Sequence, residues 1–255
     1  MKPVSMLVLL LVCAGIPRVA IAQDAKGEVN NGTDPTRLTT SAAIVNEYND
    51  IAPDFSRQAL RFDLTLPFGA TSDYSVRLRV PVVSFDIAGD DDFDLGDVQL
   101  QLTHVFGLTR QRGLVAQGEL VFDTAQRPEL GTGKHVFKGT FIYARFLPRG
   151  IFAPAVVHSI DVGGDEDRAD VNSSTFDFYY VPKLADPRTF VTLDPALTVD
   201  WENDKEFASF AATVGRSVGP AFGGVAQVFV KPSVFGGSDR PGDWAIEVGF
   251  KVLGF

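Results

Sequence analysis

Cysteine is almost absent from this chain of 255 residues. Its one cysteine, Cys13, lies in an apolar N-terminal stretch, which excludes a disulfide scaffold and any zinc site built on cysteines. Basic residues are also scarce, because 23 Lys and Arg stand against 32 Asp and Glu and leave a formal charge of -9. No basic surface is available for phosphates, so nucleic acid is excluded as a partner.

The chain also lacks an apolar run long enough for a transmembrane helix, which needs about 18 residues. The N-terminal run covers residues 4–16 and ends at Pro17. A short basic start, a hydrophobic stretch and small residues before Gln23 are typical of a secretory signal peptide. We predict that residues 1–22 are this signal peptide, and that residues 23–41 form a flexible polar lead.

A sustained helical period is missing as well, and apolar residues instead recur at every second position. Leu60, Phe62 and Leu64 alternate with Arg61 and Asp63, for example. This period of two predicts β-strands, and the segments exceed the about five or six residues usual in soluble sheets. Twelve strands are predicted, over residues 42–50, 56–66, 74–85, 95–106, 114–123, 135–146, 151–161, 171–183, 189–201, 207–216, 221–232 and 244–254.

The connections between these strands alternate between two kinds. One kind is short and slightly basic, as at residues 67–73, 147–150 and 217–220, whereas the other is mostly longer and strongly acidic, as at residues 86–94 and 162–170. A soluble sandwich or a lipocalin-like barrel would have no reason to sort its loops in this way. Short periplasmic turns and long extracellular loops are typical of transmembrane barrels.

We therefore predict an all-β fold, a transmembrane antiparallel β-barrel of about 12 strands over residues 42–255. In lipid every backbone N–H and C=O must be paired within the protein, and a closed barrel leaves no open edge. An even strand number also brings both ends of the barrel to one side of the membrane. The final residue, Phe255, closes an aromatic-rich last strand, a feature that is common in outer-membrane barrels.

Two motifs then resemble a known family. Residues 95–100 read Leu-Gly-Asp-Val-Gln-Leu, and residues 129–134 read Glu-Leu-Gly-Thr-Gly-Lys. Together they resemble the LGD-(I/V)-x-L and LGTGK patterns of the outer-membrane transporter family named for the MetA pathway of phenol degradation. The resemblance covers roughly residues 40–255 and implies an outer-membrane barrel for small, often aromatic, compounds. The chain departs from the family at residues 157–160, where Val-His-Ser-Ile stands in place of Asn-His-x-Trp.

Other candidate sites have simpler interpretations. Residues 131–134 read Gly-Thr-Gly-Lys, but Pro128 and His135 occupy the positions where a P-loop needs Gly and Ser or Thr. The acidic loops at residues 90–94 and 165–170 offer oxygen ligands, yet we interpret them as solvated loops that at most bridge cations to lipopolysaccharide. A lipid hydrolase would need a His–Ser dyad, and the adjacent His158 and Ser159 point to opposite faces of a strand. We predict no enzyme, no cofactor and no resident metal.

The inward-facing positions are the most informative set. Acidic and basic residues are both plentiful there, so they could form a structural network, a solute path, or both. The predicted lumen-lining residues are Arg61, Asp63, Arg77, Arg79, Asp97, Gln99, Gln101, Gln117, Glu119, Asp123, Lys138, Asp177, Glu247 and Lys251, and alternation adds Lys183, Asp194 and Asp200.

The sequence thus favours a passive outer-membrane channel for small solutes, and the family resemblance implies that these solutes are often aromatic. Its expected partners are outer-membrane lipid, lipopolysaccharide and the barrel-assembly machinery. A non-conducting barrel that serves a structural role or interacts with lipopolysaccharide is the alternative, and a lipid-modifying hydrolase is the third hypothesis.

Overall fold

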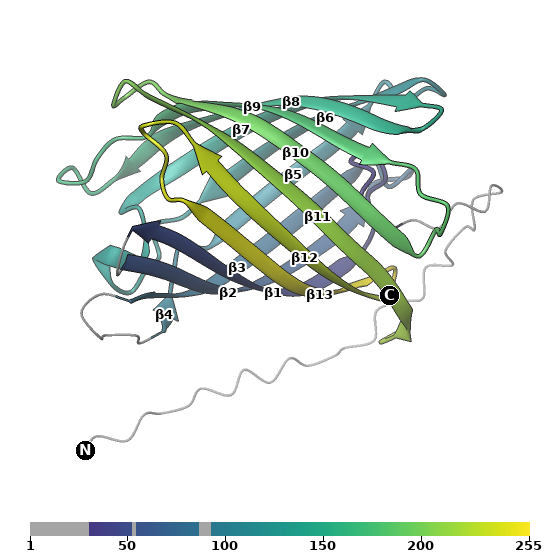
Figure 1. The fold of residues 1–255 in the computed structure, drawn as a ribbon, viewed down its shortest axis with the longest axis horizontal. Coiled ribbons are helices and arrows are strands. Elements are labelled where there is room, and N and C mark those ends of the chain that lie inside the picture. Colours follow the sequence, from purple (N-terminus) through teal and green to yellow (C-terminus); the bar gives the residue numbers. More distant parts are fainter. Residues whose placement is uncertain (1–30, 53–54, 87–92) are drawn as a thin grey trace, which may run out of the picture.

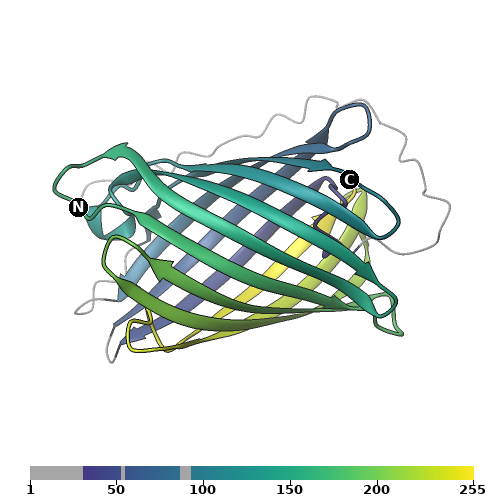
Figure 2. The ribbon, with the colours of Figure 1, turned by 90° about the horizontal axis from the view of Figure 1, so that it is seen from above.

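Twelve long antiparallel strands close into a barrel (Figures 1 and 2). The computed structural model describes residues 31–52, 55–86 and 93–255, so the predicted signal peptide and residues 23–30 lie outside the described residues. Each strand pairs with its neighbour in sequence, and β1 also pairs with β13 to complete the ring. The predicted twelve-stranded barrel is confirmed.

The long strands are β1 (Ser41–Ala52), β2 (Phe55–Phe68), β3 (Tyr74–Asp86), β5 (Gln99–Phe106), β6 (Arg112–Val121), β7 (Lys134–Leu147), β8 (Gly150–Gly164), β9 (Asn172–Pro182), β10 (Thr189–Asp200), β11 (Lys205–Ala221), β12 (Gly224–Gly236) and β13 (Trp244–Leu253). A two-residue strand, β4 (Asp94–Leu95), pairs with the end of β3, and the 3-10 helix η1 (Pro128–Leu130) lies between β6 and β7. No helix among these described ranges is both long enough and apolar enough to cross a membrane.

The two ends of the barrel differ in their connections. At one end, here called the turn end, β1 begins opposite the last residues of β13, since Ser41 pairs with Leu253. The short turns of residues 69–73, 107–111, 148–149, 183–188 and 222–223 lie at this same end. The other end, here called the loop end, carries the longer connections, including residues 122–133 and 165–171.

One predicted turn is wrong. Residues 217–220 were expected to connect two strands, but they belong to β11, which continues to Ala221. The reversal occurs at Phe222 and Gly223, whose φ angles of 51° and 84° are both positive. Two-residue hairpin turns with positive φ at both positions match the right-handed twist of the flanking strands. The register between β11 and β12 shifts by one residue between Ser217 and Gly219, which lets β11 continue through residues 217–221.

The outside of the barrel is an apolar surface. Large apolar side chains on alternate positions are exposed, among them Leu102 at 51% and Val248 at 54%. Near the turn end, aromatic rings follow one another around this surface, and the rings of Tyr74 and His104 stack with centroids 4.2 Å apart. Near the loop end, Tyr48 contacts Trp244 at 5.3 Å. An apolar band between aromatic girdles is typical of transmembrane barrels.

Candidate lumen site

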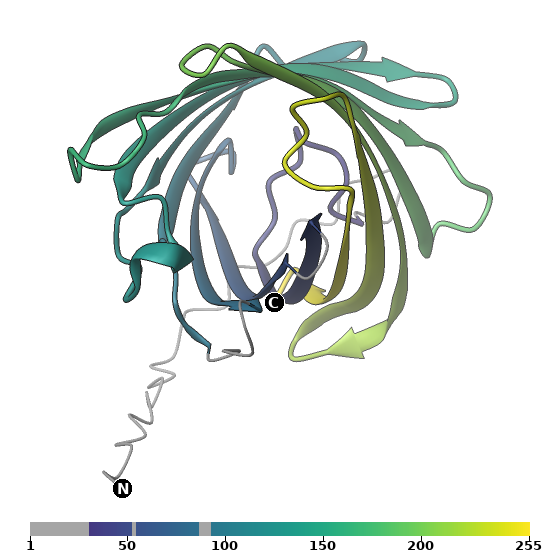
Figure 3. The same cartoon turned by 60° about the vertical axis from the view of Figure 1, so that its left-hand side comes forward.

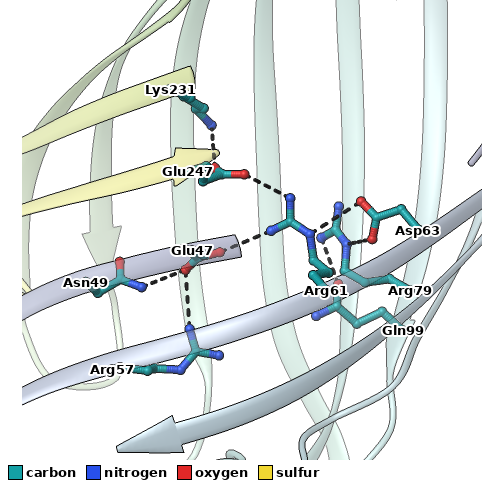
Figure 4. A network of polar contacts seen from close by, with 9 residues as sticks. All are labelled: Glu47, Asn49, Arg57, Arg61, Asp63, Arg79, Gln99, Lys231 and Glu247. Carbon is teal, nitrogen blue, oxygen red and sulfur yellow. Dashed lines mark hydrogen bonds and ion pairs between the residues drawn. The ribbon is translucent and has the colours of Figure 1, made fainter. Parts of the chain in front are cut away.

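The alternation that exposes apolar residues turns polar residues inward. The charged side chains of the lumen fall into two networks, which we call the arginine cluster and the glutamate cluster. The arginine cluster contains Glu47, Arg57, Arg61, Asp63, Arg79, Gln99, Lys231 and Glu247 (Figure 4). The glutamate cluster contains Arg77, Gln101, Gln117, Glu119 and Lys138.

Arg61 is at the centre of the arginine cluster. Its guanidinium lies 2.9 Å from the carboxylate of Glu247, 3.1 Å from that of Glu47 and 3.4 Å from that of Asp63. These partners come from β13, β1 and β2, so the arginine ties together the strands that close the ring (Figure 4). Arg79 extends the cluster, because its Nε donates to Asp63 at 3.0 Å. The side chains of Arg61, Asp63 and Glu247 are only 16–17% exposed, so the pairing offsets the cost of removing these charges from water.

Glu119 organises the second network. Its carboxylate lies 3.4 Å from Arg77 and 3.5 Å from Lys138, and it also accepts a hydrogen bond from the amide of Gln101. The side chain of Glu119 is 8% exposed, whereas those of Arg77 and Lys138 are 30% and 35% exposed. One buried acid is therefore shared by two cations that retain access to the lumen.

Three members of these networks were not predicted from the sequence. Glu47 lies on the first predicted strand, at residues 42–50, and none of Glu47, Arg57 and Lys231 was assigned to the lumen. The strand register identifies them as inward-facing, because Glu47 and Lys231 both pair with Glu247 from the neighbouring strands. Arg57 is four residues before Arg61 on the same strand, so both side chains point to the same face.

The remaining predicted residues lie apart from the networks. Asp177 on β9 is near Asp194 on β10, and one carboxylate oxygen of each is buried. Lys251 on β13 contacts the N-terminal segment near Gly32. Three others lie at the ends of the barrel and not within the lumen. Asp123 is exposed at the loop end, while Lys183 belongs to a turn and Asp200 caps the turn that follows β10.

Asp97 also differs from its predicted role, because its carboxylate holds a loop in place. One oxygen accepts hydrogen bonds from the backbone N–H groups of Thr124 and Ala125, both at 3.2 Å. The other accepts from the N–H of Thr132 at 2.8 Å and from its hydroxyl at 3.2 Å. Asp97 is 8% exposed, and we call this arrangement the loop clamp.

The loop clamp explains why the two sequence motifs occur together. A Cβ on Gly131 would lie 2.5 Å from the carboxylate of Asp97, so only glycine permits this approach. Gly133 has a φ of 69°, which favours glycine, and the guanidinium of Arg168 donates to the carbonyls of Thr132 and Gly131 at 3.1 and 2.8 Å. The Leu-Gly-Asp and Gly-Thr-Gly-Lys segments are thus two halves of one structural contact.

A cavity of about 440 Å³ lies in the lumen beside the clamped loop. Its volume falls within the range of about 300–1,000 Å³ found for ligand pockets. Four cationic side chains and three acids line it together with the loop backbone. The lining residues are Glu47, Arg57, Ala59, Arg61, Arg79, Pro81, Asp97, Gln99, Val121, Glu129, Leu130, Gly131, Thr132 and Lys138.

Among the described residues, His158 lies within hydrogen-bond distance of a serine. His158 Nδ1 lies 3.0 Å from the hydroxyl of Ser174 on the neighbouring strand, the cross-strand arrangement that a dyad would need. However, Ser174 is 9% exposed, and its hydroxyl accepts a hydrogen bond from the indole N–H of Trp201 at 3.0 Å. The three side chains thus join β8, β9 and the turn after β10. Among described residues, no three His, Cys, Asp or Glu side chains could hold a metal ion together.

The fold is shared with solved outer-membrane channels. A COG4313 outer membrane channel from Pseudomonas putida F1 has a TM-score of 0.68 and 11% identity, covering 89% of this chain and 100% of that one. The KdgM porin has a TM-score of 0.58 and 6% identity, covering 83% and 98%. The NanC porin has a TM-score of 0.57 and 11% identity, covering 84% and 99%. No protein-family model and no curated protein matches the chain. The resemblance to the MetA-pathway family therefore remains a prediction.

Proposed function

We propose that the protein is a passive channel of the outer membrane that admits small solutes through its lumen. The observation that carries the proposal is the cavity of about 440 Å³, which is lined by inward-facing side chains of the barrel wall, among them Arg57, Arg61, Arg79 and Lys138. Solved channels with the same fold support it. The apolar outer surface would face outer-membrane lipid and lipopolysaccharide, and insertion would require the barrel-assembly machinery.

The lumen supports selectivity over general diffusion. Twelve strands lie between eight-stranded barrels, which side chains nearly fill, and barrels of about 16–18 strands, which hold a wide aqueous channel. Here the arginine cluster and the glutamate cluster line the lumen with paired charges. Arg77 and Lys138, each about one-third exposed, can contact a passing solute while Glu119 holds them in place. Guanidinium groups bind carboxylates and stack on aromatic rings, so a small aromatic or carboxylate solute fits this chemistry.

Single-channel recording in planar bilayers, combined with swelling of protein-loaded vesicles in solutes of increasing size, tests the proposal. We expect low conductance and a sharp size limit. Bilayers that remain silent, together with vesicles that exclude even the smallest solutes, would favour the alternative of a non-conducting structural or lipopolysaccharide-interacting barrel. The hydrolase hypothesis is disfavoured by the burial of Ser174, and incubation with outer-membrane lipid followed by analysis of released fatty acid would test it directly.

A further inference from the structure

The two ends of the lumen hold different segments of the chain. At the turn end, residues 31–40 lie within the ring of strands, in purple in Figure 3. The hydroxyl of Tyr179, on β9, donates a hydrogen bond to the carbonyl of Thr33 at 3.1 Å. The N–H of Gly254 donates to the carbonyl of Thr40 at 2.8 Å. This segment is therefore attached to the wall and is a fixed part of the turn end.

At the loop end, the connection at residues 122–133 folds inward against the wall. Leu130, in η1, is 4% exposed and packs against Ala59 on β2 and Val83 on β3. Each of these two wall residues is an even number of positions from an arginine of the arginine cluster on its own strand, so both side chains point into the lumen. An apolar side chain buried against the inner wall places this loop inside the rim of the lumen.

Contacts on both sides of η1 along the chain hold it at this depth. Before and after η1, the loop clamp binds backbone N–H groups to the carboxylate of Asp97. The neighbouring acidic loop binds the same segment, because the N–H of Asp165 donates to the carbonyl of Gly133 at 2.8 Å. The ammonium of Lys134, only 6% exposed, lies 2.6 Å from the carboxylate of Asp170. The loop is therefore held in the lumen by several independent contacts.

Glu129, also in η1, has the most exposed charged side chain among the residues that line the lumen cavity. It is 44% exposed, compared with 35% for Lys138 and 29% for Arg57. The four cations of the lining each lie within 3.5 Å of a carboxylate of the wall. Glu129 instead lies 3.6 Å from Arg127 of its own loop. A solute in the cavity thus meets this carboxylate on the loop and paired cations on the wall.

We propose that residues 128–132 form the constriction of the solute path and that Glu129 sets its charge preference. This inference rests on the proposed channel function. The loop narrows the lumen beside the arginine cluster, so the size limit is set there. Low-dielectric walls strengthen the field of an exposed carboxylate, which attracts cationic groups and repels anions. A solute that carries a carboxylate for the wall arginines should therefore pass more readily when it also carries an ammonium group for Glu129.

The variant Glu129→Cys tests this constriction, because an adduct on its thiol would project into the cavity. The chain's own cysteine, Cys13, lies in the predicted signal peptide, so the introduced thiol is the target in the mature chain. Glu166→Cys is the matched control, since it removes the same charge from an exposed position that does not line the cavity. Methanethiosulfonate reagents of similar size attach either a sulfonate or a trimethylammonium group, and mass spectrometry measures the adduct.

In planar bilayers, we expect either adduct to lower the conductance of Glu129→Cys severalfold and a reductant to restore it, while Glu166→Cys does not respond. The trimethylammonium adduct should also shift the reversal potential in a salt gradient in the direction that indicates anion selectivity, relative to the sulfonate adduct.

A thiol at residue 129 that does not react, or an adduct there that leaves the conductance unchanged, would overturn the constriction and leave the channel function standing. An equal fall in conductance for Glu166→Cys would overturn it as well. Equal reversal potentials for the two adducts would overturn the role of Glu129 in charge preference. Silence of the wild type and of both variants before any modification would instead refute the channel function itself.

Discussion

Replacement of Asp97 by alanine should release the loop of residues 122–133 without unfolding the barrel. The carboxylate accepts four hydrogen bonds, three of them from backbone N–H groups of that loop. A hydrogen bond to a charged group contributes about 1.5–3 kcal/mol when it is fully buried. The loop lies at the rim, where the freed N–H groups can reach water, so we expect a total loss of roughly 3 kcal/mol.

That loss would be local, because opening of a loop need not involve the strand ladders. A change of about 3 kcal/mol corresponds to roughly a hundredfold increase in the population of the open loop. The amide hydrogens of Thr124, Ala125 and Thr132 should exchange faster by about this factor. Asp97→Asn keeps one acceptor oxygen and should show a smaller increase, of about tenfold.

Hydrogen exchange followed by mass spectrometry of the reconstituted barrel measures this directly. Peptides that cover residues 122–133 report on the loop, and peptides from β8 report on the wall. Gln126→Ala, which removes an exposed side chain of the same loop, is the matched control. If the loop of Asp97→Ala exchanges at the wild-type rate, the carboxylate does not hold it, and the explanation of the paired sequence motifs is wrong.

Two further predictions concern charge. The double variant Arg77→Ala/Arg79→Ala should leave a more negative lumen, so its reversal potential in a salt gradient should shift in the direction that indicates cation selectivity. Arg110→Ala, in an exposed turn, is the control and should not shift the reversal potential. An unchanged potential in the double variant would mean that these arginines lie off the ion path. The N–H of Arg188 donates to Asp186 and, with the charge of Arg216, lowers the pKa of that carboxyl. Asp186→Asn should therefore lose a little stability in urea at neutral pH, and the difference should disappear as the pH falls through this lowered pKa; a pH-independent difference would contradict it.

The barrel could be predicted because the same requirement, an apolar side chain outward and a polar side chain inward, recurs at every second residue. Lipid outside and paired charges inside require opposite chemistry on the two faces of each strand, so Phe62 and Asp63, for example, identify both faces. The turn at residues 222–223 was harder to predict. Gly219 and Pro220 have the composition of a turn, but the hydrogen-bonding register with β12 continues past them to Ala221.

The loop clamp and the position of residues 31–40 could not be predicted from the alternation of apolar and polar residues. Asp97 has the parity of an inward residue, and nothing local shows that three N–H groups from residues 124–132 converge on it. Residues 31–40 have no period at all, and a polar segment of that kind reads as a flexible lead until the position of Tyr179 is known. Both features depend on contacts between segments far apart in the chain, which alternation does not encode.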